Sequence, residues 1–384
     1  MTTQRSAAPG VDRLARALLR GSAWALKILR PQAIRNFDVV IDGQTLDPGL
    51  RQAMGLYGLM PRKPMNAIPL RYSRAAMNFG GRMLGHAIPQ RRIEDLEIPG
   101  NGGPIPARLY APTTSTDTGA LIVFFHGGGW TVGSIDACDN VCRFLADRSG
   151  IPVLSIGYRL APEHPFPAAI QDAIAAYRFA HDNAEQLGGR PDRLVVAGES
   201  AGGNLAAVTA QHATAAGIPP AFQLLFCPIT DLSRKRHSYS LFSDGYVLTE
   251  AHMDWFRNNY LSDPAQATDP RASPLLASDL SGLPPAYIAV SGFDPLRDEG
   301  EEYAHRLQNT GVPTTLRRHP TLIHGIIYGT AFGNAGRTVL LEAVSALHTA
   351  LDAGLSPAPT VAGWNPLPHS DVRDARDRPS GPMC

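Results

Sequence analysis

The chain has 384 residues, which is long for one domain but within the size that α/β sheets reach as single units. Its 35 basic and 34 acidic residues leave a net charge of +1, so the overall charge gives no reason to expect a nucleic-acid partner. The four cysteines form no disulfide framework, and no apolar run approaches the roughly 18 residues of a membrane span. These features predict a cytoplasmic protein.

Residues 11–30 have the periodicity of a helix, with Arg13, Arg16, Arg20 and Lys27 on one narrow stripe and apolar residues opposite. The favoured interpretation is a helix packed against the rest of the protein with its charges in water. The alternative is a basic amphipathic helix that rests on an anionic membrane and makes the protein peripheral there. The basic residues interrupt the apolar stretch, which excludes the layout of a signal peptide.

Residues 31–90 contain prolines, methionines and short helical patterns, and Pro31 is expected to end the first helix. The stretch is not repetitive. We therefore interpret residues 1–90 as an N-terminal helical cap or flanking segment rather than as a second domain.

From about residue 93 onward, apolar runs alternate with helical segments. Strands are predicted at 121–125, 152–156, 194–197, 222–226, 286–290 and 314–318, and helices near 134–148, 166–187, 200–216, 295–310 and 335–354. Runs that are apolar throughout indicate strands buried on both faces, hence a mostly parallel central sheet flanked by helices, with sites at the carboxyl ends of its strands. This α/β catalytic domain is assigned to residues 91–355, and the proline-rich residues 356–384 are predicted to be a disordered tail.

The segment Gly198-Glu199-Ser200-Ala201-Gly202 lies between a predicted buried strand and a predicted helix. A serine at such a strand–turn–helix apex lies on a strained elbow that exposes its hydroxyl, and the flanking glycines remove side chains that would clash. We therefore interpret Ser200 as a nucleophile.

A serine hydroxyl needs a histidine base that a carboxylate orients. Asp294 follows the strand predicted at 286–290, where it could equally cap the next helix. Asp298 and Glu299 are interpreted as charges in the first turn of that helix. Of two candidate bases after the strand predicted at 314–318, His324 is preferred to His319, because a glycine follows it. The order Ser200, Asp294, His324 is the one that the α/β-hydrolase fold uses.

The strand predicted at 121–125 ends in His126-Gly127-Gly128-Gly129-Trp130. Bare backbone N–H groups of this loop, with that of Ala201, could stabilise the oxyanion of an attacked carbonyl. The loop lacks the sequence patterns of nucleotide-binding loops. His126 precedes the nucleophile in the chain and is interpreted as a structural anchor of the loop. Cys138 and Cys142 are interpreted as packing residues, because no further cysteine or histidine cluster completes a metal site.

Five motifs in this order resemble the hormone-sensitive-lipase-like family of α/β-hydrolases, a group that includes bacterial carboxylesterases. The resemblance covers roughly residues 90–350 and is carried by residues 126–133, 158–169, 198–203 and 294–300 and by His324-Gly325. It implies Ser200 as nucleophile, Asp294 as orienting acid, His324 as general base, and Gly128, Gly129 and Ala201 as oxyanion-hole donors in a loop that Gly127 shapes. It also implies that no metal or organic cofactor is needed and that the N-terminal segment forms a cap over the site.

The sequence departs from this family at Glu199, where aspartate or threonine is common, and at Ile326, where phenylalanine is commoner. The resulting prediction is a serine carboxylesterase or lipase that forms an acyl-enzyme on Ser200 with small-molecule esters, with short to medium acyl chains expected. Two alternatives remain: an amide-cleaving deacetylase with the same triad, or a ligand-binding protein on this fold, like the plant gibberellin receptors that lack the catalytic histidine. The natural substrate stays open, as does the oligomeric state, for which a homodimer is one option.

Overall fold

The computed structural model describes residues 38–59 and 67–354. The basic stretch 11–30 and the tail 356–384 lie outside the described residues. None of the described helices is both long enough and apolar enough to cross a membrane.

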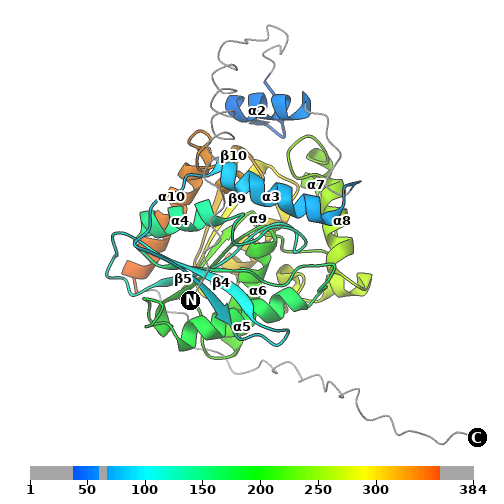
Figure 1. The fold of residues 1–384 in the computed structure, drawn as a ribbon. Coiled ribbons are helices and arrows are strands. Elements are labelled where there is room, and N and C mark those ends of the chain that lie inside the picture. Colours follow the sequence, from blue (N-terminus) through cyan, green and yellow to red (C-terminus); the bar gives the residue numbers. More distant parts are fainter. Residues whose placement is uncertain (1–37, 60–66, 355–384) are drawn as a thin grey trace, which may run out of the picture.

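An eight-stranded sheet with the strand order β10-β9-β8-β7-β5-β6-β4-β3 runs through the protein (Figure 1). In this order, all neighbours from β10 through β9, β8, β7 and β5 to β6 pair in parallel. Strand β4 pairs antiparallel with both β6 and β3. Their bounds are β3 (Arg92–Ile98), β4 (Ile105–Ala111), β5 (Leu121–Phe125), β6 (Val153–Ile156), β7 (Leu194–Glu199), β8 (Phe222–Phe226), β9 (Ala286–Phe293) and β10 (Thr314–Ile323). The predicted mostly parallel sheet is confirmed.

The central strands are apolar throughout because each faces a hydrophobic core on both sides. In β5, Val123 and Phe125 belong to one buried cluster, whereas Ile122 and Phe124 belong to the other. Such alternation follows from the two-residue period of a strand. The runs that are apolar without interruption thus predicted a sheet with helices on both faces.

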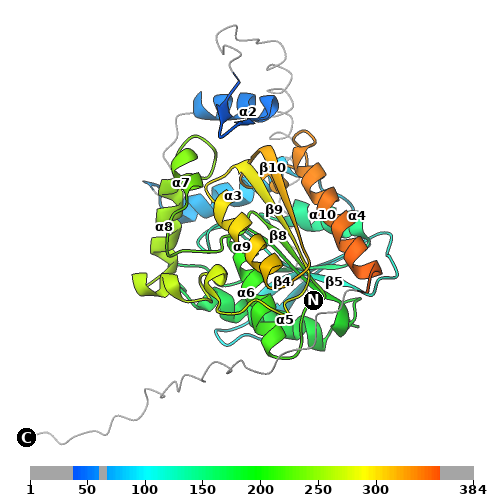
Figure 2. The ribbon, with the colours of Figure 1, turned by 180° about the vertical axis from the view of Figure 1, so that it is seen from behind.

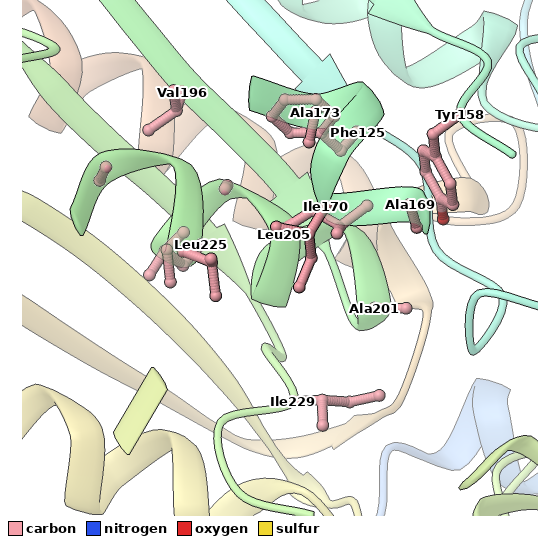
Figure 3. Packing of buried hydrophobic residues seen from close by; sticks show 14 of the residues in the cluster. Phe125, Tyr158, Ala169, Ile170, Ala173, Val196, Ala201, Leu205, Leu225 and Ile229 are labelled. Atoms are coloured by element: carbon pink, nitrogen blue, oxygen red, sulfur yellow. The ribbon is translucent and has the colours of Figure 1, made fainter. Parts of the chain in front are cut away.

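Long helices cover both faces of the sheet (Figure 2). One buried cluster includes residues of α4 (Asp139–Ser149) and α10 (Ala335–Asp352); the other includes residues of α5 (Ala168–Asp182), α6 (Ala201–Ala215) and α9 (Arg297–Asn309). Figure 3 shows the second cluster, in which Ile170 and Ala173 of α5 and Leu205 of α6 lie near Val196 and Leu225 of the sheet. This packing supports the start of α6, where the predicted nucleophile lies.

The predicted element positions are confirmed, but some boundaries differ. The helix expected from residue 134 begins at Asp139, because Ser134 Oγ instead accepts a hydrogen bond from Ala137 N and donates to Asn78. The strands β3 and β4 were not predicted individually; β3 lies at the sheet edge, and charged residues interrupt its apolar pattern. Residues 231–260, for which no helix or strand was predicted, contain α7 (His237–Leu241) and α8 (Glu250–Tyr260).

The described part of the N-terminal segment forms a small hairpin and two helices: β1 (Val40–Ile41), β2 (Gln44–Thr45), α2 (Pro48–Leu59) and α3 (Leu70–Leu84). Figure 1 shows α3 above the sheet. Arg74 of α3 donates to the carbonyls of Thr131 and Ala161, in the loops that follow β5 and β6. The helix therefore lies at the carboxyl ends of the strands. Short 3-10 helices complete the fold at Pro191–Arg193, Pro264–Thr268, Pro274–Leu276 and Ile326–Tyr328 (η5).

Candidate active site

Ser200 lies at a strained turn between β7, which ends at Glu199, and α6, which begins at Ala201. Its φ of 56° and ψ of −117° are unusual for a residue with a side chain. The neighbouring glycines make the turn sterically feasible. A Cβ on Gly198 would lie 2.2 Å from the carbonyl oxygen of Gly202, and a Cβ on Gly202 would lie 2.0 Å from that of Phe125. The structure thus contains the elbow that the sequence predicted.

Asp294 and His324 meet at the carboxyl ends of β9 and β10. Oδ2 of Asp294 is 2.7 Å from Nδ1 of His324, the length of a charge-assisted hydrogen bond. Oδ1 of the same fully buried carboxylate accepts from the N–H of Leu296, at the start of α9. Asp294 thus contacts both His324 and the turn that leads into α9, although the N-cap of that helix is Leu296 and no side chain caps it.

The other nitrogen of His324 faces a second carboxylate. Nε2 lies 3.2 Å from Oε1 of Glu199, whereas Oγ of Ser200 makes no hydrogen bond within the described chain. Burial alone would lower the pKa of His324, but the carboxylates of Asp294 and Glu199 together raise that pKa well above its usual value. Burial raises the pKa of Glu199 to about 7, although the charge of His324 opposes this shift.

His319 and His126, the other two histidines considered from the sequence, have different surroundings. His319 lies on β10, 4.0 Å from Glu342, and burial lowers its pKa. His126 is buried, its Nδ1 is 2.8 Å from the carbonyl oxygen of Gly127, and its ring stacks on Tyr158. Burial lowers the pKa of His126 to about 4, so it is neutral at pH 7. This geometry agrees with His126 as an anchor of the glycine loop.

The glycine loop adopts conformations that only glycine takes easily. Gly128 has a φ of 112° and Gly129 a φ of 56°. The N–H of Gly127 donates to the hydroxyl of Tyr328 at 2.9 Å. Gly127 therefore shapes the loop, and its N–H is already engaged and cannot serve as a free oxyanion donor.

Three other N–H groups of the predicted oxyanion hole remain available. Within the described chain, no acceptor is found for those of Gly128 and Gly129. Ala201 opens α6, and the first N–H groups of a helix have no partner inside it. The ring of Phe256 on α8 packs so tightly on the loop that a Cβ on Gly129 would lie 2.1 Å from it.

Tyr328 and Cys227 also lie at the site, and sequence reasoning missed both. Cys227 directly follows β8, has a φ of 42°, and lies with Asp294 and His324 in a group whose ligand atoms are within 4.8 Å of one another. Burial raises the pKa of its thiol to about 11. The 2.7 Å contact between Asp294 and His324 is shorter than the roughly 3.3 Å that two ligands about 2 Å from a tetrahedral zinc ion would have. The dyad therefore has the geometry of a hydrogen bond.

Two acids lie in the first turn of α9, as predicted. Asp298 accepts from the N–H of Ser238. Glu299 is fully buried and accepts from the N–H of Thr230 and the hydroxyl of Tyr239. Burial raises the pKa of Glu299 to about 8. This side chain thus ties α9 to the segment after β8, a structural role beyond that of a helix-end charge.

The geometry has counterparts in known proteins. Residues 122–328 match the model of a protein family that is described as having the alpha/beta hydrolase fold. The carboxylic ester hydrolase LipN of Mycobacterium tuberculosis is 44% identical over 330 residues, which cover 82% of this chain and 85% of LipN. The ethyl acetate hydrolase of Pseudomonas putida is 38% identical over 267 residues, 68% of this chain and 84% of that protein.

Solved structures of esterases are also similar to this chain. The ester-hydrolase EH1AB1 from the metagenome of Lake Arreo is 40% identical, with a TM-score of 0.76 over 80% of this chain and 99% of that one. The hyperthermophilic esterase of the archaeon Pyrobaculum calidifontis is 39% identical, with a TM-score of 0.75 over 80% and 99%. The resemblance to bacterial carboxylesterases that the motifs carried is confirmed by these matches.

Proposed function

The chain belongs to the α/β-hydrolase fold family and is a carboxylic ester hydrolase, and on this premise we propose that Ser200, His324 and Asp294 carry its reaction. The observation that carries the proposal is the 2.7 Å contact between His324 and Asp294, at the same end of the sheet as the elbow of Ser200. A histidine oriented by a buried carboxylate is the partner that a serine nucleophile needs.

In the proposed reaction, Oγ of Ser200 attacks the ester carbonyl while Nε2 of His324 takes its proton. The carbonyl electron pair moves onto oxygen, where the N–H groups of Gly128, Gly129 and Ala201 stabilise the charge. The intermediate collapses, the alcohol leaves with the proton from His324, and an acyl group remains on Ser200. Water, deprotonated by His324, then attacks the acyl carbon; the bond from that carbon to Oγ breaks, the proton returns from His324 to Oγ, and the acid is released.

The N-terminal segment is proposed to cover this site and to shape the substrate pocket. Support comes from Arg74 of α3, which donates hydrogen bonds to the loops after β5 and β6. We propose esters with short to medium acyl chains as substrates, in keeping with the name of the Pseudomonas relative. Membrane contact through residues 11–30, a homodimer and a cytoplasmic location stay predictions.

The test is a series of p-nitrophenyl esters with acyl chains of two to twelve carbons, assayed with wild type, Ser200→Ala and His324→Ala. We expect turnover of the shorter esters by wild type, and a loss of at least about 10³-fold in both variants with nearly unchanged melting temperatures. A p-nitroanilide of the best acyl group tests amide cleavage in parallel. A Ser200→Ala variant that retains activity would refute the assignment of the nucleophile.

A further inference from the structure

Glu199 lies directly before the proposed nucleophile and contacts two other parts of the site. Its Oε1 is 3.2 Å from Nε2 of His324. Its Oε2 accepts a hydrogen bond of 3.1 Å from the hydroxyl of Tyr328, and that hydroxyl accepts one of 2.9 Å from the N–H of Gly127. One carboxylate at the end of β7 thus links the segment from His324 to Tyr328 (the histidine loop) with residues 126–130 (the glycine loop).

We propose that Glu199 is a positioning residue, which holds the imidazole of His324 at the elbow and, through Tyr328, fixes the glycine loop that carries the oxyanion donors. This role rests on the proposed assignment of Ser200 and His324. It deepens that assignment by giving the acid of the elbow motif a function in the reaction.

The surroundings of Glu199 are difficult to explain by packing alone. Its side chain is 3% exposed, and a buried carboxylate is costly unless it is paired. Oε1 has no conventional hydrogen bond within the described chain, so the imidazole of His324 is its one close polar neighbour there. The adjoining cavity, also lined by Cys227 and Ile326, has room for about one water molecule. The pairing with His324 is thus the main contact that compensates for the burial of Oε1.

Several titratable groups surround this pair, and they decide its charge. His324 faces Glu199, Asp294 after β9 and Cys227 after β8; Glu199 in turn faces Tyr328 and lies in the field of Tyr158. Burial raises the pKa of Glu199 to about 7, while its charge helps to raise that of His324. Protons on such a close pair come off in steps that belong to the pair rather than to one residue.

The carboxylate has two opposite effects on the reaction. It favours the protonated imidazole in the resting enzyme, and this form cannot accept the proton of Ser200. It also stabilises the imidazolium that forms when that proton moves from Oγ to Nε2 as the Oγ–carbon bond forms. Removal of the charge should therefore move the acid limb of the pH–rate profile to lower pH and also lower the rate on the plateau.

The test measures kcat and KM for p-nitrophenyl acetate between pH 4.5 and 9 in the full-length protein. Glu199→Gln should shift the acid limb of kcat/KM down by about one pH unit, because one neighbouring charge is lost. Its plateau kcat should fall about tenfold or more, with little change in KM. Glu199→Asp keeps the charge and should keep the limb closer to that of wild type.

Tyr328→Phe tests the link to the glycine loop. It removes the acceptor of the Gly127 N–H but leaves the charge of Glu199, so kcat should fall while the acid limb stays closer to that of wild type than in Glu199→Gln. Glu299→Gln is the matched control, because it alters a buried carboxyl whose hydrogen-bond partners within the described chain are Thr230, Asp231 and Tyr239 and do not include His324. Its acid limb and kcat should match those of wild type.

Two results would overturn the proposal. The first is a Glu199→Gln enzyme whose acid limb and kcat match those of wild type. The second is an equal shift of the acid limb in the control. If Glu199→Gln does not fold, a limb in Glu199→Asp that falls by a full pH unit although the charge is kept, together with an unchanged kcat in Tyr328→Phe, would also refute it. Activity in Ser200→Ala would instead refute the proposed function, so the two failures are distinguishable.

Discussion

Arg74 of α3 and Glu163, in the loop after β6, form a two-point ion pair with N–O distances of 2.8 and 2.6 Å. The same guanidinium also donates to the carbonyls of Thr131 and Ala161. Because Glu163 is half exposed, the ion pair alone contributes little free energy. The bonds to the two carbonyls are what fix α3 to the loops after β5 and β6.

Arg74→Ala should therefore do more harm than Glu163→Gln. Loss of two hydrogen bonds to backbone carbonyls costs roughly 1 kcal/mol each, which lowers the melting temperature by several degrees. Because α3 loosens over the site, KM for short esters should rise several-fold. Glu163→Gln should stay near wild type in both respects. Equal effects of the two substitutions would show that the ion pair, and not the carbonyl contacts, holds the helix.

Gly202→Ala should disrupt the elbow. Its added Cβ would lie 2.0 Å from the carbonyl oxygen of Phe125 in β5, so the backbone of α6 or β5 would have to shift. We expect a loss of several kcal/mol in the free energy of unfolding, or no folded protein. At the neighbouring Gly203 the nearest atom is 3.0 Å away, on Pro228, so Gly203→Ala is the matched control and should be milder. Thermal melts compare the two variants.

Gly129→Ala should impair the reaction more than the fold. Gly129 has a φ of 56°, and a Cβ there would meet the ring of Phe256 at 2.1 Å, so the loop that carries a proposed oxyanion donor must move. Loss of one such donor lowers kcat about 10²–10³-fold. Gly217 also has a positive φ but open space around it, so Gly217→Ala should lose about 1 kcal/mol of stability and keep its kcat. A Gly129→Ala enzyme with normal kcat would exclude this donor.

Glu299 should make the protein less stable as the pH rises. The pKa of this buried carboxyl is raised to about 8 in the folded protein, against 4.5 as its ordinary value. Between these values the unfolded chain releases the proton and the folded one retains it, so stability falls with pH by up to about 1.4 kcal/mol per unit. Chemical denaturation from pH 4 to 9 should show this fall in wild type relative to Glu299→Gln. Parallel curves would contradict the assignment.

The parts of the fold that the sequence predicted are those buried on both faces. Runs such as residues 121–125 and 222–226 are apolar without interruption because two helix layers cover them, and β5 and β8 coincide with the predicted ranges. The edge strand β3 alternates charged and apolar residues, and only its pairing with β4 makes it a strand. The helix α8 mixes polar and aromatic residues, so its periodicity was weak.

The parts of the candidate site that could be predicted are those whose geometry is set by a short stretch of neighbouring residues. The elbow at Ser200 follows from a local pattern, whereas β9 and β10 run on to Phe293 and Ile323, beyond the predicted ranges 286–290 and 314–318. The contacts of Glu199 were not predictable, because they depend on where β10 and the glycine loop lie relative to β7. Tyr328, four residues after His324, carried the one signal available: a hydroxyl in the histidine loop. Arg74 was missed because two of its partners are backbone carbonyls, which leave no trace in a sequence, and the third, Glu163, lies 89 residues away along the chain.

The hairpin β1–β2 has a consequence for how the protein is completed during synthesis. Gln44 donates to the carbonyl of Gly292 across 248 residues of chain, and the N–H of Asp47 donates to that of Thr321 in β10. These first described residues therefore leave the ribosome long before their partners exist. The hairpin can therefore take its place against β9 and β10 only after the last of the described strands has been made.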